Sequence, residues 1–135
     1  LRSVRYEHTF SLSYIDIDNF KAINDTLGHL EGDRLLKTVS NSLTLSLRQT
    51  DIIARLGGDE FAVLLPETPL AGARECAQRI QDAIKREADA PLGSSIGCVE
   101  YTVIPQSVDE MVQIADRAMY QAKRSGRNQI FGHRT

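Results

Sequence analysis

The stretch DIIARLGGDEFAVLL at residues 51–65 decides the fold. Two runs rich in apolar and β-branched side chains, 51–56 and 61–65, flank a Gly-Gly pair. Because glycine tolerates the positive φ angles of tight turns, this stretch predicts a β-hairpin whose glycines adopt such angles. The hairpin would carry Asp59 and Glu60 near its tip.

The segments on either side of this hairpin alternate between strand and helix patterns. Strands are indicated by alternating or continuous apolar runs, and helices by apolar side chains that recur every three or four residues. The predicted elements lie at residues 10–17, 20–27, 35–47, 51–56, 61–65, 70–84, 94–101, 108–119 and 129–131. Strands and helices interleaved around a hairpin favour an α/β or α+β fold, with a mixed, mostly antiparallel sheet flanked by helices.

Composition narrows the classes of function. The chain has 135 residues, 41% of them hydrophobic, which predicts one domain with an ordinary core. Its net charge of −2 offers no broad positive field to a nucleic-acid backbone, so we expect no nucleic-acid partner. No apolar run approaches the roughly 20 residues that cross a bilayer. We therefore expect a cytoplasmic chain without membrane contact of its own, and buried, reduced thiols at Cys76 and Cys98, which lie among apolar residues.

Adjacent carboxylates on a glycine turn point to a metal ion. Asp59 and Glu60 repel each other unless a cation neutralises them, and Asp16 ends the strand predicted at residues 10–17. Magnesium takes oxygen ligands, commonly from one or two carboxylates and substrate phosphates. A solvated hairpin tip without a metal is the alternative from these residues alone.

A second stretch, DIDNFKAINDTLGHLEGD at residues 16–33, stands in front of the hairpin. Together with GGDEF at 57–61, SIG at 95–97 and ADRAMYQAKRSGRN at 115–128, it resembles the GGDEF family of diguanylate cyclases over nearly the whole chain. The resemblance implies a nucleotidyl-cyclase, ferredoxin-like fold. It also implies a magnesium-dependent enzyme that condenses two GTP molecules into cyclic di-GMP and releases two pyrophosphates.

The resemblance assigns a metal cradle to Asp16, the backbone carbonyl of Ile17, Asp59 and Glu60. Two Mg²⁺ or Mn²⁺ ions would activate the attacking 3′-hydroxyl and neutralise the transferring phosphate. Either Asp59 or Glu60 would also accept the hydroxyl proton as the catalytic base.

GTP-binding residues follow from the same resemblance. Asn24 and Asp33 match the guanine readers, and a carboxylate can accept from the two donors that guanine has and adenine lacks. The remaining implied GTP contacts are packing by Leu36 and triphosphate binding by Asn19, Phe20, Lys21, Lys123 and Arg127. The alternatives are helix caps for Asn24 and Asp33, and a solvated helix end for Lys123 and Arg127.

The segment RQTD, which joins Arg48 to Asp51, stands where the family carries its RxxD product-inhibition site. Arginine suits phosphates and guanine edges, so cyclic di-GMP could bind back there, with Arg79 as a second contact. An ordinary surface ion pair is the alternative.

The resemblance implies a homodimer, because each domain would hold one GTP and neither could close the ring alone. We expect residues 1–135 to be a single catalytic domain from a longer regulatory protein. The segment resembling Asp-x-Leu-Thr-Gly-Leu-x-Asn-Arg-Arg that usually precedes the family's first helix is missing. Rival interpretations are a silent cyclic di-GMP or GTP binding module, and another nucleotidyl cyclase or palm-type polymerase.

Overall fold

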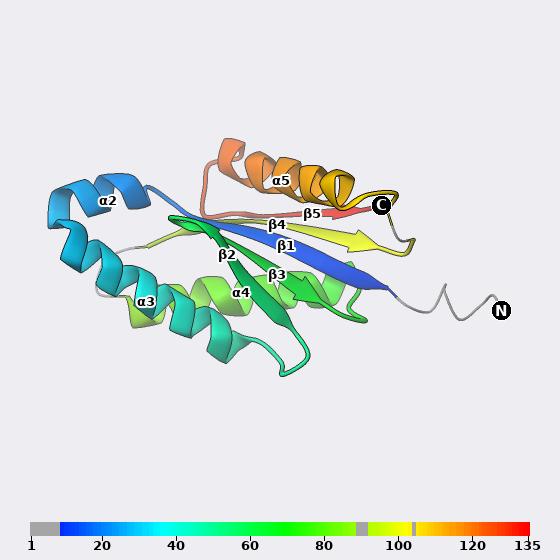
Figure 1. The fold of residues 1–135 in the computed structure, drawn as a ribbon, viewed down its shortest axis with the longest axis horizontal. Helices are drawn as coiled ribbons and strands as arrows, with labels where there is room; N and C mark the ends of the chain where they lie inside the picture. Colours follow the sequence, from blue (N-terminus) through cyan, green and yellow to red (C-terminus); the bar gives the residue numbers. More distant parts are fainter. Residues whose placement is uncertain (1–8, 89–91, 104) are drawn as a thin grey trace.

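The computed structural model describes residues 9–88, 92–103 and 105–135, and it confirms the predicted order of strands and helices. The elements are β1 (Phe10–Ile17), α2 (Phe20–Leu27), α3 (His29–Ser46), β2 (Ile52–Gly57), β3 (Glu60–Leu65), α4 (Leu70–Glu87), β4 (Ser94–Tyr101), α5 (Val108–Arg124) and β5 (Ile130–Arg134). Figure 1 shows them in sequence colours.

The strands form one sheet in the order β2-β3-β1-β4-β5. β1 is antiparallel to both of its neighbours, β2 and β3 pair as a hairpin, and β5 runs parallel to β4 at the edge. The arrangement β4-β1-β3-β2 is that of a ferredoxin-like, split βαβ fold. The predicted mixed, mostly antiparallel sheet and the edge strand near residue 130 are both confirmed.

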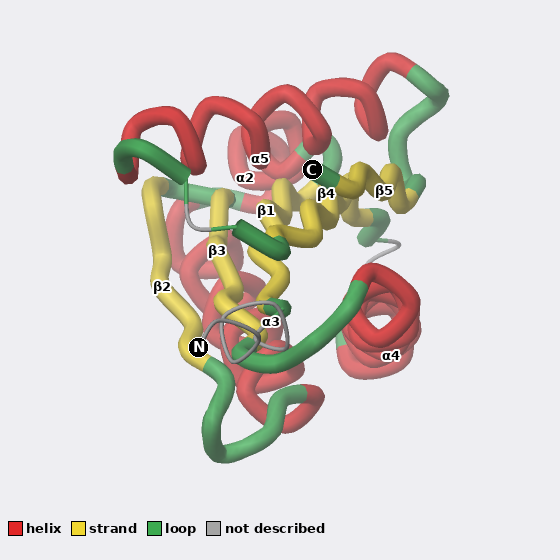
Figure 2. Tube along the Cα trace, turned by 90° about the vertical axis from the view of Figure 1, so that its right-hand side faces the viewer, coloured by secondary structure: helices red, strands yellow, loops and turns green. Residues whose placement is uncertain are grey.

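Helices cover both faces of this sheet, as Figures 1 and 2 show: α3 and α4 lie on one side and α5 on the other. The period of two in β1 divides its side chains between the layers. Ile15 and Ile17 join the core that includes α3 and α4, whereas Leu12 and Tyr14 join the core that includes α5. Even-numbered residues of β1 therefore face α5.

Gly97 of β4 fixes how closely α5 lies on the sheet. A Cβ at this position would fall 2.2 Å from the backbone nitrogen of Met119 and 2.4 Å from the carbonyl carbon of Ala118. Only glycine admits a helix backbone so near a strand. The end of α5 that carries Lys123 is thereby held over the sheet.

The other sequence-level expectations concern thiols and membrane spans. Cys76 and Cys98 are free and buried, as predicted, and burial raises the pKa of Cys98 to about 11. Among the residues that the structure describes, none of the helices is both long enough and apolar enough to traverse a bilayer.

Candidate active site

Three carboxylates converge where β1 meets the β2-β3 hairpin. Asp16 pairs with Glu60 in the strand register, so their side chains leave the same face of the sheet. The next residue of β1, Ile17, donates its N–H to the Asp59 carbonyl at 3.1 Å, which holds the turn against the strand end. Ligand oxygens of Asp16, Asp59 and Glu60 all lie within 4.8 Å of one another.

The turn itself is built differently from the prediction. Neither Gly57 nor Gly58 is among the described glycines with positive φ, so that part of the hairpin argument was wrong. A register shift between Arg55 and Gly57 turns the chain instead, and the Arg55 guanidinium donates to the carbonyls of Gly57 and Gly58 at 3.3 and 2.8 Å. A Cβ at either glycine would meet nothing within 4 Å, so the glycines leave open space beside the carboxylates.

The electrostatics of Asp16 favour a cation. Asp16 is only 5% exposed. Burial and the nearby Asp59 carboxylate raise the pKa of Asp16, although Lys123 opposes this shift. Its Oδ1 is buried and has no hydrogen-bond partner among the described residues. Buried carboxylate oxygens normally have partners, so Asp16 Oδ1 fits the role of a metal ligand.

Lys123 supplies a positive charge to the cluster. Its Nζ forms an ion pair with Asp16 Oδ2 from the last turn of α5. Burial alone would lower the pKa of Lys123, but the hydrogen bond and charge of Asp16 outweigh burial and raise it. The ammonium therefore stays charged and stands beside the position that a metal would take.

Asn24 and Asp33, the predicted guanine readers, lie on neighbouring helices. Asn24 Nδ2 donates to His29 Nδ1 at 3.3 Å, and a Cβ at Gly32 would fall 1.7 Å from Asn24 Oδ1. The amide thus lies directly on the α3 backbone beside Asp33. Gly28, and not Asp33, is the N-cap of α3, which removes the capping alternative for Asp33. Leu36, one turn further along α3, is buried in the core.

Only some of the residues predicted to contact phosphate lie near the carboxylates. Asn19 caps α2 in a left-handed conformation with φ 57°, Phe20 is buried and Lys21 is exposed on the first turn. Arg127 follows α5, with Nη1 4.0 Å from Asp18 Oδ1. Lys123 and Arg127 therefore reach the same strand end as the carboxylates, whereas no contact ties Lys21 to them among the described residues.

Comparison with known proteins decides the family. A family model for the GGDEF domain of diguanylate cyclases matches residues 1–129. The chain belongs to the GGDEF family of diguanylate cyclases. It is 38% identical to the probable diguanylate cyclase DgcT of Escherichia coli over 129 residues, which cover 90% of this chain but only 28% of DgcT.

Solved structures agree with this GGDEF assignment. The diguanylate cyclase SiaD from Pseudomonas aeruginosa, solved with its activator SiaC, superposes with a TM-score of 0.88 at 35% identity, covering 97% of this chain and 52% of that one. The GGDEF domain of DgcB from Caulobacter crescentus, solved in complex with c-di-GMP, gives 0.85 at 28% identity, covering 93% and 78%. The predicted fold is thus confirmed.

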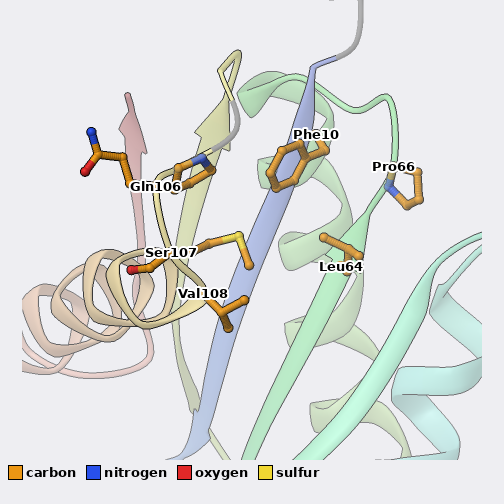
Figure 3. Close-up of a pocket in the computed structure, with 8 residues that line it drawn as sticks. Phe10, Leu64, Pro66, Gln106, Ser107 and Val108 are labelled. Carbon is orange, nitrogen blue, oxygen red and sulfur yellow. The ribbon is translucent and has the colours of Figure 1, made fainter.

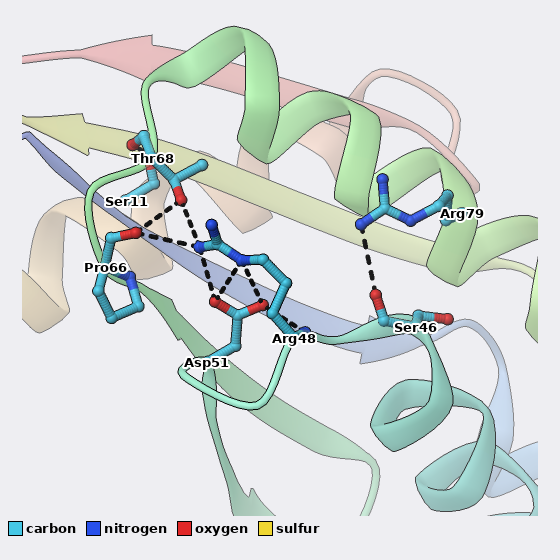
Figure 4. A network of polar contacts seen from close by, with 7 residues as sticks. All are labelled: Ser11, Ser46, Arg48, Asp51, Pro66, Thr68 and Arg79. Carbon is cyan, nitrogen blue, oxygen red and sulfur yellow. Dashed lines mark hydrogen bonds and ion pairs between the residues drawn. The ribbon is translucent and has the colours of Figure 1, made fainter.

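A second polar site of this GGDEF domain surrounds Arg48, between α3 and β2 (Figure 4). The Arg48 guanidinium donates to Asp51 Oδ1, the Pro66 carbonyl and Thr68 Oγ1 at 2.9, 3.0 and 2.8 Å. The Asp51 side chain is only 2% exposed beneath this guanidinium. Arg79 of α4 lies across the same small pocket of about 150 Å³ and donates to the Ser46 carbonyl at 3.3 Å.

A larger, apolar groove of about 480 Å³ is not part of either site. Phe10, Leu64 and Pro66 line it together with the residues that lead into α5, as Figure 3 shows. It lies at the opposite end of β1 from Asp16, and none of its lining residues carries a charge. A triphosphate would find no counter-ion there.

The sequence interpretation assigned no role to three residues that lie beside the predicted site: Asp18, Ser95 and Asn128. Asp18 accepts from both of the others. Its place at the strand end was a visible signal, but its partners come from β4 and from the turn after α5.

Proposed function

We propose that this GGDEF domain is a diguanylate cyclase that joins two GTP molecules into cyclic di-GMP with release of two pyrophosphates. The observation that carries the proposal is the convergence of Asp16, Asp59 and Glu60 beside the Lys123 ammonium. The match covers only 28% of the length of DgcT.

Recognition of GTP is assigned to the two helices beside the carboxylates. Asp33 accepts from the guanine donors, and the Asn24 amide, held between His29 and Gly32, meets an acceptor edge of the base. Adenine would leave the Asp33 carboxylate without a donor, and an unmatched acceptor disfavours the wrong base. Lys123 and Arg127, with the first turn of α2, bind the triphosphate.

The carboxylates are the groups that would hold a catalytic metal. Asp16, Asp59, Glu60 and the Ile17 carbonyl would bind Mg²⁺ or Mn²⁺, which lowers the pKa of the 3′-hydroxyl and neutralises charge on the α-phosphate. Asp59 or Glu60 accepts the hydroxyl proton. The buried position of Asp16 in β1 would fix one of the metal ligands in place.

Two copies of the chain complete the reaction. The described residues of one copy include one set of proposed guanine readers and one carboxylate cluster, so each bound GTP needs a partner whose 3′-hydroxyl attacks its α-phosphate. Association of two domains supplies this proximity, and the rate should rise with protein concentration.

Product analysis tests this function. Purified chain incubated at high concentration with GTP and Mg²⁺ is expected to form cyclic di-GMP and pyrophosphate, and ATP in its place is expected to give no cyclic product. Chelation of the metal should stop the reaction. Binding of GTP or cyclic di-GMP without turnover would favour the silent binding module instead, because such a module needs the pocket but not the chemistry.

We further propose that Arg48 and Asp51 form the product-inhibition site, with Arg79 as a second contact. Arg48→Ala is expected to raise the cyclic di-GMP concentration that halves the initial rate by at least about tenfold, because a bidentate phosphate or guanine contact is lost. Initial rates across a series of cyclic di-GMP concentrations measure this. Arg86→Ala, at an exposed arginine on α4, is the matched control, and an Arg48→Ala inhibition curve identical to that of the wild type would contradict the assignment.

A further inference from the structure

Asp18 is a buried carboxylate that lies outside the metal cluster. It is 6% exposed, two residues beyond Asp16 and just past the end of β1. Its Oδ1 accepts from Ser95 Oγ at 2.6 Å, and its Oδ2 accepts from the backbone N–H of Asn128 at 2.7 Å. The backbone N–H of Asp18 donates to the Gly93 carbonyl at 3.0 Å, so the residue joins three separate segments.

The turn that Asp18 holds has an unfavourable backbone conformation. Gly126, Arg127 and Asn128 have φ angles of 117°, 62° and 50° in succession. Asparagine enters the left-handed region readily, but arginine rarely does, so the angle at Arg127 persists only when the surroundings fix it. The hydrogen bond from Asn128 to Asp18 is a buried, charge-assisted contact that can supply this restraint.

Close packing around Asp18 restricts the positions that its carboxylate can take. A Cβ at Gly93 would lie 3.0 Å from Asp18 Oδ2 and 3.1 Å from Asn128 Cβ, so the missing side chain at Gly93 makes room for this contact. The carboxylate is therefore fixed on both oxygens. Its position in turn fixes the backbone on which Arg127 stands.

We propose that Asp18 is a positioning residue, which orients the turn after α5 so that Arg127 and Lys123 meet the triphosphate of GTP. Arg127 Nη1 lies 4.0 Å from Asp18 Oδ1, and Lys123 precedes the turn on the last helical turn of α5. The inference rests on the proposed function, because the triphosphate is the ligand that these two cations serve. Both carboxylate oxygens of Asp18 already accept hydrogen bonds from the protein, so the role inferred for it is to position the turn.

Asp18→Asn tests this role with little change in shape. The amide can point its oxygen at the Asn128 N–H only if its NH₂ group donates to the Ser95 hydroxyl, and in either orientation it loses the charge-assisted hydrogen bond that restrains the turn. Binding of 3′-deoxy-GTP with Mg²⁺, measured by calorimetry, avoids turnover because the attacking hydroxyl is absent. We expect affinity for 3′-deoxy-GTP to fall about tenfold, and affinity for 3′-deoxyguanosine, measured by NMR titration, to stay unchanged.

Glu100→Gln is the matched control. Glu100 is also 6% exposed, accepts a backbone N–H from Leu70 at 2.7 Å and lies 3.6 Å from an arginine, Arg134, but it is at the far end of β4. Glu100→Gln should lower the melting temperature about as much as Asp18→Asn does. It should leave the affinities for 3′-deoxy-GTP and 3′-deoxyguanosine unchanged. In turnover, Asp18→Asn should raise KM for GTP about tenfold and change kcat by less than about threefold.

The outcomes separate this inference from the proposed function. Unchanged affinity of Asp18→Asn for 3′-deoxy-GTP would overturn the positioning role. An equal fall in affinity for 3′-deoxy-GTP and for 3′-deoxyguanosine would overturn it too. If Asp18→Asn does not fold, Ser95→Ala removes the 2.6 Å hydrogen bond alone, and unchanged triphosphate affinity in that variant would overturn the role as well. Wild-type chain that binds no guanine nucleotide at all would overturn the proposed function first, and this inference with it.

Discussion

Replacing Asp59 with alanine is expected to abolish formation of cyclic di-GMP, with kcat at least about 1000-fold below that of the wild type. Asp59 is one of three carboxylates whose oxygens lie within 4.8 Å of one another. A bound metal contributes several kcal/mol to stabilising charge in the transition state, and each 1.36 kcal/mol changes the rate about tenfold. Initial rates with GTP and Mg²⁺ at a fixed, high protein concentration measure this loss.

Folding should survive the same substitution. Asp59 raises the pKa of Asp16 by charge repulsion, after the larger effect of burial, so its removal relieves the metal-free cluster. The melting temperature of metal-free Asp59→Ala should therefore equal or exceed that of the wild type, as is common where a site holds like charges together. Asp82→Ala, at an exposed residue of α4, should leave the rate unchanged. Normal turnover in Asp59→Ala would remove the metal assignment.

The strands and the carboxylate cluster could be predicted because local patterns determine them. Alternation along residues 10–17 defines β1, and the period of two places Asp16 on the same face as Tyr14. A hairpin that pairs with β1 then brings Glu60 opposite Asp16. The two local signals place each carboxylate on its own element, and the long-range pairing of the hairpin with β1 brings them together.

Contacts that depend on the packing of α5 could not be predicted in the same way. Nothing local to Lys123 indicates that its ammonium meets Asp16, since this contact needs the close approach of α5 at Gly97. The left-handed angle at Arg127 also lies outside what residue type suggests, whereas asparagine, as at Asn128, enters this region readily. The bulge after Arg55 likewise replaced the expected glycine conformations in the hairpin.

Replacing Lys123 with methionine is expected to change metal binding and catalysis in opposite directions. Without nucleotide, the ammonium neutralises Asp16 and competes with any cation for the cluster. Its removal leaves three carboxylates without this charge, so Mn²⁺ alone should bind at least about tenfold more tightly. Turnover of GTP should nevertheless fall about 100-fold, because the triphosphate loses a cation that the proposal assigns to it.

Calorimetry with Mn²⁺ and rate measurements on the same protein samples test both directions for Lys123→Met. Lys37→Met replaces an exposed lysine on α3 and should leave Mn²⁺ affinity and turnover as in the wild type. Weaker Mn²⁺ binding in Lys123→Met would mean that the lysine supports the metal instead of competing with it. The expected pair of results implies that metal arrival frees the ammonium from Asp16, so that one side chain neutralises the resting cluster and then serves the bound triphosphate.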